Sequence, residues 1–313
     1  MKIAYQTIHF RQESLDLIDI CNRIIDEYTQ AGFVLTRRQL YYQLVARGII
    51  PNADKQYDRL ISIVNNGRLA GLIDWEAIED RTRNVRSIAH FDGPKDGLDS
   101  LAYQYAIDKW ADQPVRPEVW IEKDALVGVV EQVCKELDVA CFSCRGYCSQ
   151  SEMWGASQRF LSRALKSQKT HVIHLGDHDP SGIDMSRDIE ERIRMFLQRY
   201  AMMFSIYECF PLHHFGFTRI ALNRDQIDLY QPPANPAKPK DVRFEAYKAV
   251  YGDSSWEVDA LPPQVLVALI RNKVVEIRNE NLYLDRVTQE ASEKRQLELI
   301  RDNWKDIAAS LNE

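Results

Sequence analysis

Apolar residues recur at helical spacing near the start of the chain. This spacing predicts a first amphipathic helix, whose buried face is formed by Leu15, Ile18, Cys21, Ile24 and Tyr28. A second helix is predicted to begin at Thr36, since Gln39 follows it as in a capping box, and to end at Gly48. A third is predicted from about Asp54 to Ala70. Three short helices in succession are typical of a helix-turn-helix or winged-helix module, and equally of a plain three-helix bundle.

The pattern changes from about residue 117, where short apolar runs alternate with amphipathic helices. Strands are predicted at 117–123, 139–143, 170–177 and 204–210, and the helices between them at 124–138, 151–166 and 181–200. This alternation predicts a parallel sheet with helices packed on it. In such sheets, functional groups gather at the carboxyl ends of the strands.

The expected fold class is therefore α/β with an α-rich N-terminal part. We expect a helical or winged-helix DNA-binding domain at 1–90, a linker at 91–116, a parallel β/α domain at 117–215 and a mainly helical C-terminal extension at 216–313. The extension includes the segment 255–263, to which the sequence pattern assigns no role.

Composition and charge narrow the class of protein. The chain has 313 residues, and its six cysteines are too few for a disulfide scaffold. It shows neither a membrane-spanning run nor a signal-peptide core, so we expect a cytoplasmic protein without membrane association. A net charge of −6 argues against a nucleic-acid partner. However, residues 36–86 contain nine basic and six acidic residues, a net charge of +3 that is compatible with contact to phosphates.

Three carboxylates lie at or just beyond the ends of two predicted strands. Glu122 lies at the end of the first strand, Asp177 ends the third, and Asp179 follows two residues later. A lone Asp-x-Asp is usually a solvated turn, but a glutamate at a neighbouring strand end favours a shared cation site. Oxygen ligands suit a hard ion such as Mg²⁺, which assists phosphoryl transfer. Lys123, as the next strand residue, is expected to point to the opposite side.

These residues belong to recognisable motifs. The segments VWIEKDA, RGY and LGDHDPSGIDM resemble the Toprim domain of the topoisomerase VI A subunit and of the related meiotic double-strand-break protein. The resemblance covers about residues 117–210 and implies that Glu122, Asp177 and Asp179 hold Mg²⁺, with Glu122 also catalytic. It further implies a DNA substrate, a homodimer in which the tyrosine of one subunit meets the metal of the other, and an ATPase partner subunit.

The helix TRRQLYYQL, residues 36–44, resembles the catalytic segment of the same family. The match makes Tyr42 the nucleophile and Arg38 its catalytic partner. The helical pattern buries Tyr41 and places Tyr42 on a different face, so we expect Tyr42 to be exposed. A phenol has a pKa near ~10 and needs a nearby cation to react, which Arg38, one helical turn earlier, is expected to supply.

Three functions follow as hypotheses. The first is magnesium-dependent DNA cleavage by transesterification through Tyr42, as in a type IIB topoisomerase. The second is a Toprim nuclease in which water attacks and Tyr42 is structural. The third is a non-catalytic DNA-binding subunit of a larger complex. A covalent adduct separates the first from the second, and magnesium binding separates both from the third.

Overall fold

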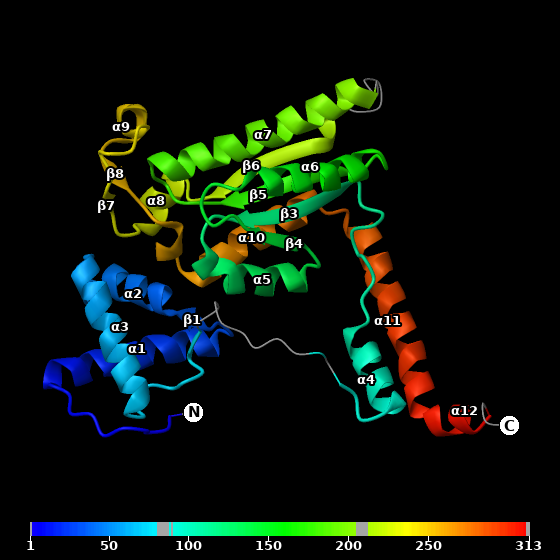
Figure 1. Cartoon of the computed structure of the whole chain (residues 1–313), viewed down its shortest axis with the longest axis horizontal. Helices are drawn as coiled ribbons and strands as arrows, with labels where there is room; N and C mark the ends of the chain where they lie inside the picture. Colours follow the sequence, from blue (N-terminus) through cyan, green and yellow to red (C-terminus); the bar gives the residue numbers. More distant parts are fainter. Residues whose placement is uncertain (1, 80–87, 89, 205–211, 311–313) are drawn as a thin grey trace.

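The structure, a computed structural model, describes residues 2–79, 88, 90–204 and 212–310, with only the backbone of 79, 201–204 and 212. It is mixed α/β, as the sequence predicts, and contains a four-stranded parallel sheet. The chain forms an N-terminal helical lobe, a sheet domain and a helical arm, which are separate in Figure 1.

The N-terminal lobe contains the three predicted helices, α1 (Gln12–Gln30), α2 (Arg37–Ala46) and α3 (Asp54–Leu69). The capping box at the start of α2 is confirmed, since Thr36 and Gln39 each accept the other's backbone N–H. The helices pack around a shared apolar core. A short parallel pair joins β1 (Leu35–Thr36) to β2 (Ile78–Glu79). Beyond β2, residues 80–87, including three of the nine basic residues, lie outside the described part.

The sheet has the strand order β4-β3-β5-β6, and every neighbouring pair is parallel. Its strands are β3 (Val115–Ile121), β4 (Ala140–Ser143), β5 (Lys169–Leu175) and β6 (Phe215–Ala221). The first three match the predicted strands. Of the strand expected at 204–210, Phe204 ends a helix and the rest lies outside the described residues. The fourth strand is β6, so the sheet continues past the expected boundary at residue 215.

Helices cover both faces of the sheet (Figure 1). On one face lie α5 (Val127–Glu136), which follows the short 3₁₀ turn η1 (Asp124–Leu126), and α10 (Pro263–Ile277). On the other lie α6 (Gln150–Ala164) and α7 (Pro180–Phe204). The alternation along β3 explains this arrangement, because Val119 and Ile121 enter the first core while Trp120 enters the second.

The region after the sheet is mainly helical. The 3₁₀ turn η2 (Leu212–His214) leads into β6, and the remaining elements are α8 (Arg224–Tyr230), β7 (Asn235–Pro236), α9 (Phe244–Tyr251), β8 (Ser254–Ser255), η3 (Val258–Ala260), α11 (Glu280–Asp302) and α12 (Trp304–Ser310). The expected linker contains an unpredicted helix, α4 (Pro94–Gln104), which packs along α11. The α4–α11 arm and the N-terminal lobe project from the same side of the sheet domain (Figure 1).

Candidate functional site

The predicted carboxylates lie together at the carboxyl edge of the sheet. β3 ends at Ile121, so Glu122 lies just beyond it, and its N–H donates to the carbonyl of Leu175 at 2.9 Å. The carboxylate Oε2 of Glu122 accepts the backbone N–H of Asp177, also at 2.9 Å. Both side chains are buried. The expectation that neighbouring strand ends bring Glu122 and Asp177 together is therefore confirmed.

Asp179 forms the N-terminal cap of α7. Its Oδ1 accepts the N–H of Gly182 at 2.6 Å and the hydroxyl of Ser181 at 2.9 Å, directly before Pro180 begins the helix. Gly182 has no room for a side chain, because a Cβ there would lie 2.3 Å from the carbonyl oxygen of Asp177. The glycine and the cap thus fix the Asp-x-Asp turn tightly against the strand.

Arg219, on the neighbouring strand β6, stabilises this turn by hydrogen bonds to its carbonyl groups. Its Nη2 donates to the carbonyls of Gly176 and Asp177 at 2.8 and 2.6 Å, and its Nη1 to that of Gly182 at 3.1 Å. Burial lowers the pKa of Arg219, against the opposing charges of the three carboxylates. A partly buried cation beside Glu122, Asp177 and Asp179 offsets part of their mutual repulsion.

Lys123 points into the site, contrary to the expectation from strand alternation. Because β3 ends at Ile121, Lys123 lies outside the pleat and is free to turn inward. Its Nζ lies 3.0 Å from Asp177 Oδ2, 2.7 Å from Glu257 Oε2 and 2.8 Å from Asp259 Oδ1. Burial acts to lower the pKa of Lys123, but these three carboxylates outweigh it and raise the pKa. The lysine is therefore a charged centre that joins three segments.

Glu257 and Asp259 come from the segment to which the sequence assigned no role. An antiparallel bridge between His178 and Trp256 holds this segment against the Asp-x-Asp turn. The N–H of Val258 then donates to Asp177 Oδ1 at 2.8 Å. The segment after α9 thus supplies two carboxylates to the site and anchors one of the predicted ones.

Arg38, on α2 of the N-terminal lobe, contacts the same two carboxylates, Glu257 and Asp259. Its Nε donates to Asp259 Oδ2 at 3.0 Å, and its Nη2 to Glu257 Oε2 at 2.6 Å. Tyr42 also donates its phenol proton to Glu257, and Arg38 Nη2 lies 3.3 Å from the Tyr42 oxygen. Arg38 and Tyr42 are therefore adjacent, as the helical spacing predicts.

Two expectations for Tyr42 are wrong. Its side chain is not exposed, because only 5% of it is accessible, close to the 4% of Tyr41. Nor does Arg38 dominate its ionisation. Burial raises the pKa of Tyr42, and the carboxylates of Asp259 and Glu257 raise it further against the lowering by Arg38. The surroundings of Tyr42 therefore favour its protonated form, which donates to the Glu257 carboxylate.

One pocket of about 470 Å³ connects the two halves of the site. It is lined from the N-terminal lobe by Arg38 and Tyr42, and from the sheet by Lys123, Asp177 and Asp179. The resemblance implied that the tyrosine of one subunit meets the metal site of another. Here a single chain brings Tyr42 and the Asp-x-Asp turn to one pocket.

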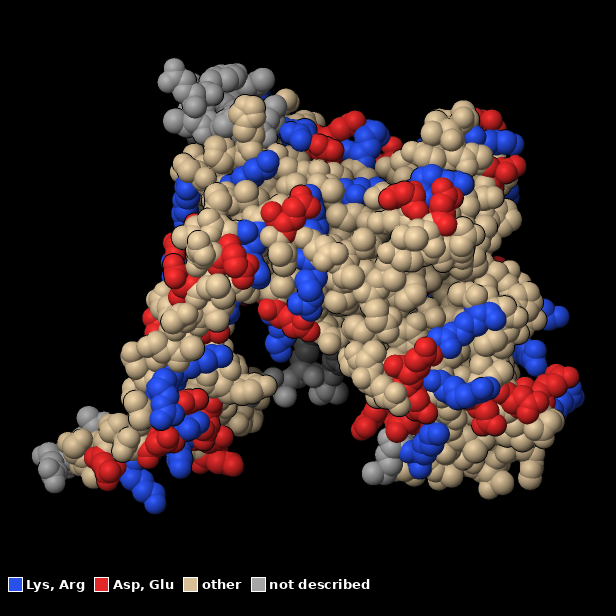
Figure 2. All heavy atoms as spheres, turned by 180° about the vertical axis from the view of Figure 1, so that it is seen from behind, with Lys and Arg blue, Asp and Glu red and all other residues tan. Residues whose placement is uncertain are grey.

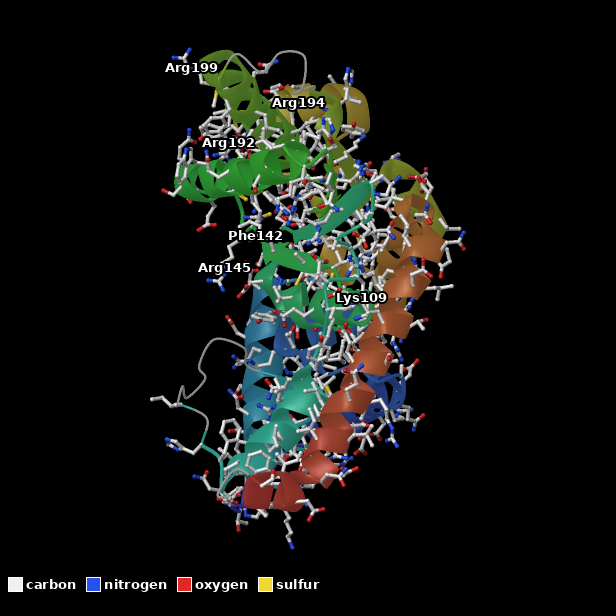
Figure 3. The ribbon with its side chains drawn as sticks, turned by 90° about the vertical axis from the view of Figure 1, so that its right-hand side faces the viewer. Lys109, Phe142, Arg145, Arg192, Arg194 and Arg199 are labelled. Carbon is white, nitrogen blue, oxygen red and sulfur yellow. The ribbon has the colours of Figure 1, made fainter. Side chains whose placement is uncertain are left out.

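A smaller hollow of about 300 Å³ lies beside this pocket and shares Arg38 and Lys123 with it. Its far side is formed by Arg145 and Gly146, which follow the edge strand β4. Arg145 is 74% exposed and bonds Asp124 Oδ1 at 3.0 Å. Figure 3 shows Arg145 next to Phe142, pointing away from the sheet domain. Basic side chains thus extend from the pocket to the edge of the sheet.

The predicted magnesium ligands fit a hard cation in type and charge. All donors are oxygens, burial raises the pKa values of Glu122 and Asp177, and the carboxylates repel one another. The positions of these side chains, in contrast, do not form a metal site. Across the described ranges, no group of three or more His, Cys, Asp or Glu side chains is placed to hold a metal ion. The Lys123 ammonium instead compensates Asp177.

Sequence reasoning placed Lys123 on the opposite side and missed Arg219, Glu257 and Asp259. For the last two, the sequence carries one signal, since the acids alternate with the apolar Trp256 and Val258, a pattern that favours partial burial. No helix in the described part of the chain is long and apolar enough to cross a membrane. Comparison of the chain with protein-family models, curated proteins and solved structures gave no match.

Proposed function

We propose that this chain binds DNA and cleaves or rearranges its backbone by transesterification through Tyr42, with Mg²⁺ at Glu122, Asp177 and Asp179. The observation that carries the proposal is the shared pocket. The Tyr42 phenol, the cationic side chains of Arg38 and Lys123, and the Asp-x-Asp turn are among the groups that line a space of about 470 Å³ within one chain. Such a set suits a phosphodiester, which needs a nucleophile, positive charge and an oxygen-ligated metal.

In this proposal the protein's own groups position and polarise the phosphodiester. Arg38 and Lys123 hold the phosphate oxygens by charge-assisted hydrogen bonds, and Tyr42 lies beside Arg38 to attack the phosphorus. The attack forms a phosphotyrosyl bond and breaks the bond from phosphorus to one deoxyribose oxygen, which leaves as a hydroxyl, so the proton lost by the phenol is balanced by the one that this oxygen gains. Asp179, fixed by its cap on α7, and Glu122, fixed against Asp177, supply oxygen ligands. Magnesium, when bound, supplies positive charge that stabilises the developing negative charge on the phosphate.

The surface charge supports local rather than extended contact with DNA. On the face shown in Figure 2, acidic and basic side chains are intermixed. In residues 36–79, Arg47 and Arg59 pair with glutamates of α1. The proposed phosphate contacts are therefore placed at the pocket and at Arg145.

A hydrolytic nuclease is the second candidate, and the state of Tyr42 favours it. The Tyr42 phenol is buried and donates a hydrogen bond to Glu257, and burial raises its pKa. The phenol is therefore not activated for attack in this structure. In that case water attacks the phosphorus and Tyr42 only positions Arg38. A non-catalytic DNA-binding subunit is the third possibility, and absence of magnesium-dependent cleavage would point to it.

The test is a denaturing gel of end-labelled DNA incubated with protein and Mg²⁺, with and without a candidate ATPase partner. The proposal predicts a slowly migrating protein–DNA adduct that is lost in Tyr42→Phe. Tyr41→Phe is the matched control, because Tyr41 bonds Asn52 and Ala53 rather than the acidic segment. Equal cleavage by Tyr42→Phe and the parent protein would reject transesterification and leave the hydrolytic nuclease.

A further inference from the structure

The Glu257 carboxylate is surrounded by donors. Its Oε2 accepts from Arg38 Nη2 at 2.6 Å, from Lys123 Nζ at 2.7 Å and from the phenol of Tyr42. These donors come from the N-terminal lobe and the sheet domain, whereas Glu257 lies in the loop between β8 and η3. One oxygen atom thus meets two cations and a hydroxyl in a pocket that opens to solvent.

This donor set is not specific to a carboxylate. A phosphate oxygen takes the same charge-assisted hydrogen bonds from guanidinium and ammonium groups, and the guanidinium fork suits it especially well. The lysine is largely buried, whereas 44% of the Arg38 side chain is exposed. Asp259 pairs with both cations and so holds them in place before any ligand arrives. The surroundings also favour an anion at this point, since Lys123, Tyr42 and Arg38 together lower the pKa of Glu257 to about 2 despite its burial.

We propose that Arg38, Lys123 and the Tyr42 hydroxyl form a phosphate-binding subsite, and that Glu257 occupies it as an internal substitute for the phosphate. DNA must then displace the Glu257 side chain to bring a phosphodiester against Tyr42. Asp259 has a different role. It is fully buried, and its two carboxylate oxygens accept from Arg38 Nε and Lys123 Nζ. Both cations therefore keep a carboxylate partner when Glu257 leaves the subsite.

The inference rests on the proposed function for its DNA substrate, but the subsite can be tested with inorganic phosphate alone. Glu257→Gln keeps the side-chain shape and removes the charge. Loss of one like charge beside the bound anion is expected to lower the Kd for phosphate by roughly tenfold, measured by calorimetry or thermal shift. Arg38→Gln added to Glu257→Gln should abolish this gain. The control is Glu136→Gln, which removes the same charge from a surface pair with Arg271 and should leave phosphate binding unchanged.

A second variant, Glu257→Asp, distinguishes displacement of the Glu257 carboxylate by phosphate from damage to the fold. Glu257→Asp keeps the charge but withdraws it by one methylene, so its phosphate affinity should fall between those of the parent and Glu257→Gln. Unchanged or weaker phosphate binding by a folded Glu257→Gln protein would overturn the inference.

DNA provides the second arm of the experiment. Short duplex DNA should also bind more tightly to Glu257→Gln than to the parent protein, as measured by fluorescence anisotropy. If phosphate binding improves but no variant binds or cleaves DNA, the subsite stands and the proposed function fails. If the parent protein cleaves DNA while Glu257→Gln shows no gain for either ligand, the function stands and the subsite inference fails.

Discussion

The ammonium of Lys123 lies 3.0 Å from Oδ2 of Asp177, so a side-chain cation already neutralises one of the proposed magnesium ligands. A metal ion at Asp177 would compete with this ammonium for the same carboxylate. The Lys123 ammonium and a bound metal ion therefore each offset the same repulsion among the clustered carboxylates.

Replacing Lys123 by Met should strengthen magnesium binding and weaken the apoprotein. Without the ammonium, the carboxylates of Asp177, Glu257 and Asp259 lose a shared partner, and removal of one member of a buried pair costs about 3–5 kcal/mol. The expected result is a lower Tm without metal and a larger rise in Tm on adding Mg²⁺. Lys109→Met, which breaks a distant pair with Glu290, is the control. An equal Mg²⁺ response in the two variants would contradict competition at Asp177.

The double variant Asp177→Asn, Asp179→Asn should lose magnesium-dependent cleavage and remain folded. The asparagine oxygens can still accept the N–H of Val258 and cap α7, so the local hydrogen bonds are kept while both charges are lost. Cleavage assays and circular-dichroism melts should be run on the same preparation. Undiminished cleavage by the folded variant would show that these residues do not hold the ion.

The ion pairs of the buried Glu118 predict a pH-dependent stability. Glu118 on β3 accepts from Arg159 at 2.9 Å and from Arg163 at 2.7 Å. Burial opposes its ionisation, but the two arginines outweigh burial and lower the pKa of Glu118. Its contribution is therefore present above the unfolded-state pKa of about 4.3 and is lost as pH falls through the lower folded-state value.

The comparison with Glu118→Gln checks this prediction. Near neutral pH the variant should be less stable by about 1.5–3 kcal/mol, as for hydrogen bonds to charged groups. The difference in free energy of unfolding should shrink steadily below about pH 4. Urea melts at several pH values measure it, and a difference that is constant with pH would contradict the assignment.

Two glycines form a matched pair for testing the tightness of the Asp-x-Asp turn. Gly182→Ala places a methyl group against the carbonyl of Asp177 and should destabilise the protein by about 1–3 kcal/mol or more. Gly155→Ala, within α6, meets no atom within 4 Å and should be neutral or stabilising by up to about 1 kcal/mol. Thermal melts that rank the two variants in the opposite order would reject the close approach at Gly182.

The elements that could be predicted from sequence are those with local causes. The capping box at Thr36 and the alternation of strands and helices depend on residues a few positions apart, and both are confirmed. The approach of Glu122 to Asp177 was also predictable, because parallel strands share an edge.

The remaining parts of the site depend on contacts that no local pattern encodes. Lys123 turns inward because β3 ends two residues earlier than expected. Tyr42 is buried because the loop carrying Glu257 packs on α2, a contact across 215 positions. Amphipathic spacing within one helix shows which face meets its own lobe, but not that another part of the chain covers a second face.

The late position of Glu257 and Asp259 in the chain has a consequence for protein synthesis. Arg38 and Lys123 leave the ribosome long before the carboxylates that neutralise them, so the nascent chain carries these cations without their final partners. A chain truncated before residue 257 keeps the tyrosine and the Asp-x-Asp turn but lacks the segment that covers them. Until the segment carrying Glu257 and Asp259 has been made, other anions, such as the phosphates of nearby RNA, meet no competing carboxylate from it at these two cations.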